Sequence, residues 1–157
     1  MIAGQFDFTL MVVHLKSIPE AERSVRIRNV QYDAINEWLE AELNRSDAET
    51  DIIIAGDFNS FNKGISSQRL LEAGHMKFIT HSLPEGSYSN IWYNRDRKRS
   101  FSLIDHIALT PTLELEEFVE LLPIGNWDKE MGGETFENSI SDHLPLVAVF
   151  RTTEDQD

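Results

Sequence analysis

The chain of 157 residues has the length of one ordinary domain, and its 41% of hydrophobic residues are enough to form a sizeable core. Its formal net charge of −13 disfavours broad, non-specific binding of polyanions through a basic surface, although a bound divalent cation would reverse the sign locally. The absence of cysteine excludes disulfides, thiolate metal sites and cysteine nucleophiles. We expect a single folded domain with its core at about residues 6–150.

The first apolar segment, Phe6–Leu15, is rich in β-formers and predicts a central strand buried on both faces. Its part Phe6–Val13 has the length of a signal-peptide core, but Asp7 interrupts it, no basic segment precedes it and no small-residue cleavage site follows it. No apolar run approaches the roughly 20 residues of a membrane span. We therefore expect a strand here, with no signal peptide and no membrane span in the chain.

A long helix is predicted next, opening at Pro19 and Glu20 and running to about Leu43. Apolar residues at three- and four-residue spacing predict its buried face, and they are Ile27, Val30, Ala34, Trp38 and Ala41, with Ile35 and Leu39 widening the stripe. Three arginines near its start are interpreted as ordinary surface charges, with a contact to phosphate as the alternative: Arg23, Arg26 and Arg28.

The middle of the chain alternates strand and helix patterns. Asp51–Ala55 predicts a second buried strand that ends in glycine, and Ser66–Ala73 predicts a short helix that is stopped by Gly74. Ser87–Tyr93 and Phe101–Leu109 predict two antiparallel strands joined across residues 94–100.

The last third is less regular. Leu113–Leu122 fits either a strand or a helix, and Pro123–Asn138 is long, polar and glycine-bearing, as is typical of a functional or mobile loop. Leu144–Phe150 predicts a final strand before the solvated acidic tail Thr153–Asp157. Because strands and helices alternate early and strands dominate later, we expect a mixed α/β or α+β layer fold.

Four short polar clusters each follow or lie within a predicted strand: His14-Leu15-Lys16-Ser17, Gly56-Asp57-Phe58-Asn59, Ile104-Asp105-His106-Ile107 and Ser141-Asp142-His143. Strand ends hold side chains rigidly while leaving them open to a ligand. Carboxylates, an amide and imidazoles delivered in this way are what metal-assisted attack on a phosphoester requires. The clusters therefore predict one site built from distant parts of the chain.

Spacing within the second cluster predicts a shared orientation. In extended backbone the side chains of Asp57 and Asn59 point the same way and would face one cleft. The carboxylate could orient or deprotonate a water molecule there, and the amide could donate to a phosphoryl oxygen.

Asp105 lies mid-strand in an apolar neighbourhood, where a hydrogen bond to an imidazole would offset the cost of burying it. We expect His143 to be that imidazole, and His106 to face the opposite side of the sheet. Asp142 and His143 are adjacent and diverge, so one could serve a metal and the other the phosphate or the attacking water.

The order of these clusters resembles that of the endonuclease/exonuclease/phosphatase superfamily, and the resemblance runs from about Phe6 to Phe150. It implies a deoxyribonuclease I-like fold, a layered β-sandwich flanked by helices. It also implies a hydrolase of phosphodiesters that depends on Mg²⁺ or Mn²⁺, or else Ca²⁺, and acts on DNA or RNA. Lipid and inositol phosphates are the alternative substrates, and bacterial members are often exported.

The same resemblance implies residue roles. Asp57 would orient the water, Asn59 would stabilise the transition state, and either Asp57 or His143 would be the base. His143 would contact the scissile phosphate with Asp105 orienting it. Asp142 would join Asp57 as a metal-site carboxylate.

His14 would be the second active-site histidine. Related domains begin with a portion that carries an asparagine and a metal-binding glutamate, and Met1–Phe6 contains neither. Residues 1–157 therefore resemble a single partial domain. This predicts an exposed sheet edge beside Phe6–Leu15 through which copies self-associate, and it keeps a catalytically inactive binding module as an alternative.

One basic cluster occurs in this acidic chain, in the predicted hairpin after Trp92 and Tyr93. Its arginines Arg95, Arg97 and Arg99 are candidates for contact with a phosphate backbone, with an aromatic ring available for stacking. A solvated hairpin tip is the alternative. Trp127 is expected either to line the cleft or to anchor the loop that contains it.

Overall fold

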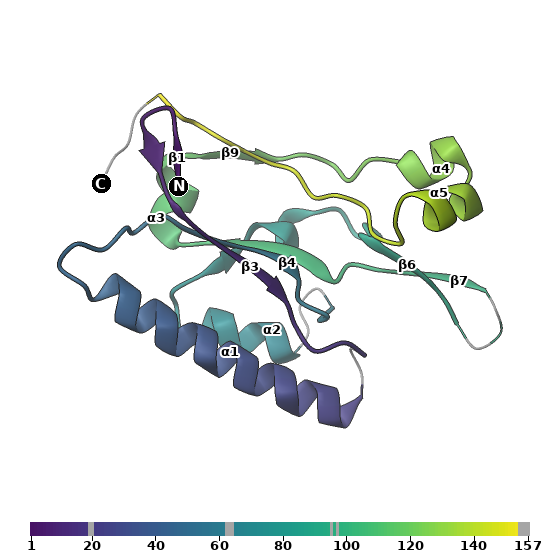
Figure 1. Cartoon of the computed structure of the whole chain (residues 1–157), viewed down its shortest axis with the longest axis horizontal. Helices are drawn as coiled ribbons and strands as arrows, with labels where there is room; N and C mark the ends of the chain where they lie inside the picture. Colours follow the sequence, from purple (N-terminus) through teal and green to yellow (C-terminus); the bar gives the residue numbers. More distant parts are fainter. Residues whose placement is uncertain (19–20, 62–64, 95, 97, 154–157) are drawn as a thin grey trace.

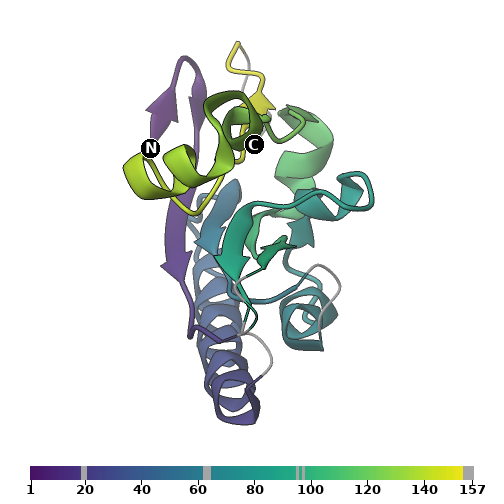
Figure 2. The same cartoon turned by 90° about the vertical axis from the view of Figure 1, so that its right-hand side faces the viewer.

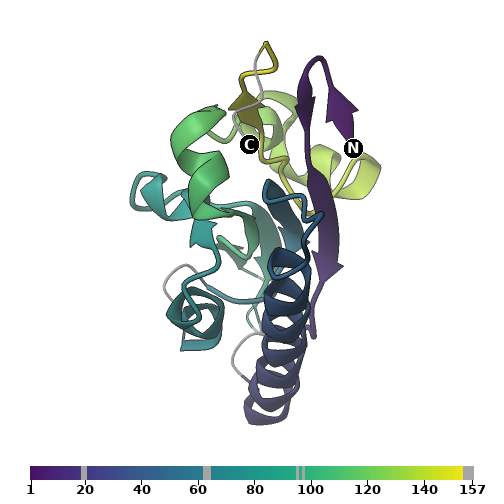
Figure 3. The same ribbon diagram turned by 90° about the vertical axis from the view of Figure 1, so that its left-hand side faces the viewer.

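The computed structural model describes residues 1–18, 21–61, 65–94, 96 and 98–153, with the backbone alone at residues 65–68. Its main sheet has the strand order β3 (Thr9–His14), β4 (Ile52–Asp57), β8 (Asp105–Leu109) and β5 (Lys77–Phe78). Strand β3 runs parallel to β4, whereas β8 is antiparallel to both of its neighbours. Helices α1 (Glu22–Leu43) and α2 (Ile65–Glu72) cover one face of this sheet (Figures 1 and 3).

Three two-stranded sheets complete the strand set: β1 (Ile2–Ala3) with β2 (Phe6–Asp7), β9 (Phe118–Leu121) with β10 (Ala148–Phe150), and β6 (Asn90–Tyr93) with β7 (Arg99–Ser102). The remaining helices are a 3-10 turn at Ile79–Ser82, α3 (Pro111–Glu116), α4 (Trp127–Met131) and α5 (Gly133–Ser139). Strands β9 and β10 lie across the main sheet from α1, so the molecule has a helix layer and two strand layers (Figure 1). The expected mixed α/β layer fold is confirmed.

Two apolar clusters fill the spaces between the layers. The cluster on the helix side contains Leu15, Tyr32, Ile35, Leu39, Ile52, Ile54, Phe58, Leu70, Met76, Phe78 and Ala108. The cluster on the other side contains Phe6, Ile53, Ile79, Ile107, Leu109 and Leu113, and residues of β9 and β10 pack against it. Alternate residues of β4 enter different clusters, as the two-residue period of a strand requires. None of the described helices is long and apolar enough to cross a membrane.

The first predicted strand is an edge strand and not a central one. The exposure of β3 alternates: Met11 and Val13 pack on the helix-side cluster, whereas Leu10 and Val12 are exposed on the other face. A continuous apolar run therefore does not distinguish a strand buried on both faces from an edge strand with an uncovered face.

A long helix forms over Glu22–Leu43 and ends where predicted, whereas its predicted opening at Pro19 and Glu20 lies outside the described residues. The buried face of this helix is rotated from the predicted one. Ile35 and Leu39 are buried, whereas Val30, Ala34 and Ala41 are exposed. The face that packs on the sheet also contains Ser24, Arg28 and Tyr32. An apolar count cannot find this face, because a buried arginine and a buried tyrosine belong to it.

Three later predictions also need correction. The segment 101–109 is two strands, because the chain leaves its pairing with β6 after Ser102 and joins β4 from Asp105. The segment 123–138 contains α4 and α5, joined at Gly132, whose positive φ of 78° permits the reversal. The last strand is only three residues long, and the ambiguous segment 113–122 contains both the end of α3 and β9.

His106 lies in the helix-side core, on the opposite side of β8 from Asp105, as expected. Its ring is 1% exposed, accepts a hydrogen bond from the Thr80 hydroxyl at Nδ1 (2.9 Å) and donates one from Nε2 to the Ser60 carbonyl (2.8 Å). Burial lowers the pKa of His106 to about 4, so the folded protein holds this ring neutral in mildly acidic solution.

We predict that this ring makes the fold sensitive to acid. Between pH 7 and pH 5 a histidine of pKa 6.5 in the unfolded chain becomes protonated, whereas His106 in the folded protein stays neutral. Folding should therefore lose about 2 kcal/mol over this interval through His106 alone. Urea unfolding of the parent and of His106→Gln at both pH values measures it: the parent should lose more stability than the variant by that amount. Equal losses, or protonation of His106 above pH 5 by NMR, would contradict the argument.

Candidate active site

Sheet register brings three of the four polar clusters into one row. His14 lies opposite Asp57 in the β3–β4 pair, and Asp57 lies opposite Asp105 in the β4–β8 pair. Neighbouring strands lie about 4.8 Å apart, so residues in register share one small region of the sheet. The fourth cluster reaches the same place through His143, whose backbone forms a bridge with Asn90.

A cleft of about 500 Å³ opens at this row. It is lined by His14, Ser17, Ile18, Asp57, Asn59, Phe61, Asn90, Trp92, Ser102, Ile104 and His143. Four of the predicted site residues are in this lining, and Asp105 lies directly behind His143.

Asp105 holds His143 through the predicted hydrogen bond. The His143 Nδ1 donates to Asp105 Oδ2 at 2.8 Å, which leaves Nε2 for the cleft. This bond is the largest cause of a raised pKa for His143, and the negative charges of Asp105, Asp57 and Asp142 add to it against the opposing effect of burial. The structure therefore keeps a larger share of this imidazole protonated near neutral pH.

Ser89 completes this arrangement and was missed by the sequence analysis. Its buried hydroxyl donates to Asp105 Oδ2 at 2.7 Å and accepts from the Asp105 backbone N–H at 3.1 Å. The carboxylate oxygen is thus fixed by a hydroxyl as well as by the imidazole. A serine at the start of a strand carries no pattern that would have indicated this role.

Asp57 and Asn59 meet through a turn and not through extended backbone. Asn59 has a positive φ of 48°, its backbone N–H donates to Asp57 Oδ1 at 2.7 Å, and its Nδ2 donates to Asp57 Oδ2 at 2.9 Å. The same Nδ2 also donates to the Leu15 carbonyl at 3.1 Å. Both amide hydrogens are therefore engaged, and the side chain fastens the end of β3 to the Asp57 turn.

Burial is the main cause of a raised pKa for Asp57, and the neighbouring charge of Asp105 raises it further. The Asn59 N–H bond and the two histidines oppose this effect. His14 is largely exposed, and its Nε2 lies 3.6 Å from Asp57 Oδ2. A carboxylate with a raised pKa is a stronger proton acceptor, which suits contact with a nucleophilic water.

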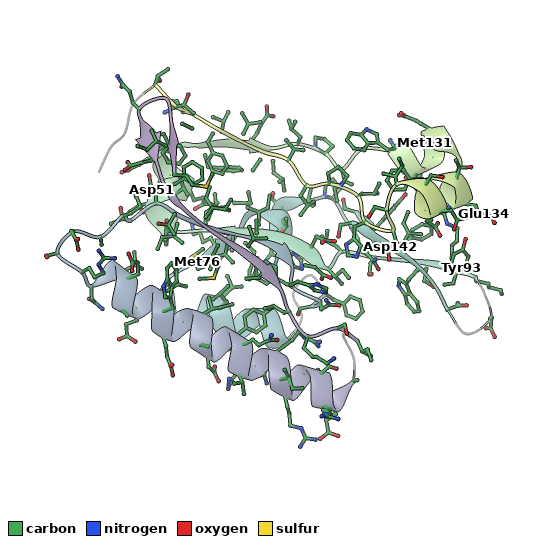
Figure 4. The ribbon with its side chains drawn as sticks, viewed as in Figure 1. Asp51, Met76, Tyr93, Met131, Glu134 and Asp142 are labelled. Atoms are coloured by element: carbon green, nitrogen blue, oxygen red, sulfur yellow. The ribbon has the colours of Figure 1, made fainter. Side chains whose placement is uncertain are left out.

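The two predicted metal carboxylates differ in their relation to the cleft. Asp57 lines the cleft, but Asp142 is exposed and contributes its backbone carbonyl to the Ile91 N–H at 2.8 Å (Figure 4). Within the described residues no group of three or more His, Asp or Glu side chains is placed to hold a metal ion. Asp57 alone meets the lower limit for Mg²⁺, which often takes one or two carboxylates and fills its shell with water and substrate oxygens.

Of the three candidate phosphate-binding arginines the structure describes Arg99, which is not in the cleft lining. Arg95 and Arg97 lie outside the described residues. The Arg99 Nη2 lies 2.6 Å from Glu137 Oε1 and 3.7 Å from Asp128 Oδ2, so two carboxylates of α4 and α5 balance its charge. Trp127 of α4 lines an apolar hollow that also touches His143.

Arg28 is the other residue that the sequence analysis misjudged. It is 1% exposed, and its Nη1 donates to the Lys16 carbonyl at 2.6 Å and to the Ile18 carbonyl at 3.5 Å. Gln31 accepts from the Lys16 N–H at 3.0 Å. Ile18 has a positive φ of 65°, which costs a β-branched residue on the order of 1–3 kcal/mol. Helix α1 therefore supports the strained loop that forms one wall of the cleft.

We predict that replacing Arg28 with methionine destabilises the fold by about 1–3 kcal/mol, because the Lys16 carbonyl loses its buried donor. Arg26→Met is the matched control. It removes an arginine that is exposed on the same helix and pairs with Glu22 across one turn, so its effect should stay within about 0.5 kcal/mol. Urea unfolding of the three proteins gives the comparison, and equal losses in both variants would show that Arg28 does not hold the loop.

Residues 6–143 match the model of the Endonuclease/Exonuclease/phosphatase family. The chain belongs to this family. No curated protein sequence matches the chain.

Solved structures agree at the level of the fold. A 3′ phosphatase, NExo, from Neisseria bound to a product DNA hairpin aligns with 90% of this chain and 60% of its own, at 17% identity and a TM-score of 0.62. An AP endonuclease from Archaeoglobus fulgidus aligns with 91% and 61%, at 16% identity and a TM-score of 0.63. A mannosyl-6-phosphatase from Bacteroides thetaiotaomicron aligns with 92% and 50%, at 14% identity and a TM-score of 0.52. The chain thus spans about half to three fifths of each of these relatives, and its fold is deoxyribonuclease I-like.

Proposed function

We propose that this domain hydrolyses phosphodiester bonds of DNA or RNA. The observation that carries this proposal is the row His14–Asp57–Asp105 across three strands, with His143 fastened to Asp105 at its end. The row joins a proton acceptor, an oriented imidazole and an open cleft of substrate size, which are the parts that attack by water on a phosphoester needs.

The proposed division of labour follows from the pKa shifts. Asp57, with its raised pKa, orients the water and takes its proton. His143, held more protonated by Asp105, faces the phosphate through Nε2, neutralises the charge that develops there and donates to the leaving oxygen. Asn59 holds the Asp57 turn in place.

A divalent cation, Mg²⁺ or Mn²⁺ with Ca²⁺ as a further candidate, would supply positive charge at the phosphoryl oxygens. We propose Asp57 as its ligand in the cleft, with Asp142 as the second carboxylate from outside the cleft lining. The alternative of an inactive binding module is favoured by one observation: within the described residues no set of three ligands is assembled.

Asp57→Asn and His143→Gln should each lower the rate of hydrolysis a hundredfold or more, because each removes a proton-transfer group. Plasmid DNA, single-stranded RNA, sphingomyelin and inositol phosphates, each with Mg²⁺ and with Mn²⁺, form the substrate panel. His75→Gln, which replaces a histidine that does not line the cleft, is the control and should keep the parent rate. A rate within tenfold of the parent in Asp57→Asn contradicts the assignment.

Two further outcomes separate the alternatives. Hydrolysis of sphingomyelin or inositol phosphates without hydrolysis of DNA or RNA would move the substrate class within the family. No hydrolysis of any substrate, together with no calorimetric binding of millimolar Mg²⁺ or Mn²⁺, would support the inactive binding module.

Self-association through β3 stays a prediction. Val12 is 74% exposed on this edge strand, and an uncovered edge favours pairing with a second copy. Light scattering at tens of micromolar should show dimers or larger species, and Val12→Lys should reduce them, since a charge on an edge strand opposes pairing. A monodisperse parent monomer would contradict this prediction.

A further inference from the structure

Two aromatic side chains stand exposed on the walls of the cleft. Trp92 is 47% exposed and Phe61 is 37% exposed, and both line the cleft that contains Asp57 and His143. Covering a water-exposed aromatic ring with a flat apolar group lowers the free energy, so such rings favour binding of a ligand that has a flat face.

The β6–β7 hairpin fixes the direction of Trp92. Asn90, Trp92 and Ser102 line the cleft, as residues on one face of a two-stranded sheet should. Phe101 belongs to the other face, where it packs on Tyr88 with a ring separation of 4.6 Å. The cleft-facing side of the hairpin therefore presents one large aromatic ring beside the register pair Asn90 and Ser102, whose side chains are joined by a hydrogen bond from Ser102 Oγ to Asn90 Oδ1 at 3.3 Å.

Among the described residues that line the cleft there is no lysine or arginine to hold a long phosphate chain. The net charge is −13, and Arg99 next to the turn of the hairpin is balanced by Glu137 and Asp128. Affinity for a nucleic acid normally comes from many cation–phosphate contacts. In this cleft stacking on the exposed aromatic rings would supply a larger share of the affinity, because the described walls carry such rings and no lysine or arginine.

From these observations we infer that Trp92, with Phe61, forms a base-stacking subsite, and that the cleft accepts one nucleotide unit at a strand end or in a short single strand. The volume of about 500 Å³ suits one such unit. The ring of Trp92 would take the face of the base, and the polar atoms of Asn90 and Ser102 would meet its edge. This inference rests on the proposed function for the placement of the phosphate beside His143.

Binding separates this subsite from catalysis. The full chain is titrated by calorimetry with adenosine 5′-monophosphate and with ribose 5-phosphate, which has the same sugar and phosphate but no base. We expect the parent to bind the nucleotide about tenfold or more tightly than ribose 5-phosphate. Trp92→Ala should abolish this preference and Trp92→Phe should retain part of it.

Phe101→Ala is the matched control, since it removes an exposed aromatic ring from the opposite face of the same hairpin. It should leave the preference intact. Equal binding of the two ligands by the parent, or equal loss of both ligands in Trp92→Ala, would overturn the stacking subsite.

The two proposals fail separately. A base preference that depends on Trp92, in a chain that hydrolyses no phosphodiester, overturns the proposed hydrolysis and leaves the subsite standing. The reverse case uses two substrates, thymidine 5′-p-nitrophenyl phosphate and methyl p-nitrophenyl phosphate, which has no base. If hydrolysis needs Asp57 and His143 but is equally fast for both substrates in the parent and in Trp92→Ala, the subsite is overturned and the proposed hydrolysis stands.

Discussion

The lateral pairing of β3, β4 and β8 places His14, Asp57 and Asp105 in one row, and every other feature of the site is arranged around that row. A slip of one residue in β4 would turn Asp57 toward the helix layer, because successive side chains of a strand face opposite sides. Gly56 supports the register at close range. It has a φ of 137°, and a Cβ at this position would collide with the Val13 carbonyl of the neighbouring strand. A side chain at position 56 would therefore push β3 and β4 apart at the very level of the site.

The row brings two carboxylates together, and neighbouring hydrogen-bond donors and imidazoles stabilise them. Asp57 and Asp105 are neighbours, and the charge of Asp105 raises the pKa of Asp57. Asp105 is relieved by His143 and Ser89, whereas Asp57 receives two bonds from Asn59 and the more distant His14. Asp105, behind the His143 imidazole, is thus held by hydrogen bonds from both a hydroxyl and an imidazole. Asp57, the carboxylate that faces the cleft, is left with a raised pKa, which suits acid–base chemistry.

The four clusters, the strands that carry them and the Asp105–His143 pair were open to prediction from sequence, because strand ends and a buried carboxylate each limit the possible arrangements. Arg28 was not, because it lies on the packed face of α1, and its partners are carbonyls of a loop twelve or fewer residues away. The Asn59 turn was missed for a related reason: a side chain that bonds its own backbone overrides the extended geometry that its strand predicts. Asp142 is not in the cleft lining, which the motif could not predict, because a motif fixes the identity of a residue but not the direction of its carboxylate.

The hairpin that carries Trp92 is tied to the segment that carries His143 by main-chain bonds. Ile91 N–H donates to the Asp142 carbonyl at 2.8 Å, and the Leu144 N–H donates to the Ser89 carbonyl at 2.6 Å. Next to its turn the same hairpin is held to α4 and α5 by Arg99. Figure 2 looks onto the end of the molecule at which these two helices lie. These contacts set the position of the indole ring relative to the imidazole before any ligand arrives. A base that stacks on Trp92 would therefore bring its own phosphate to a fixed place near His143. The favourable free energy of stacking would then help to position the phosphate for reaction.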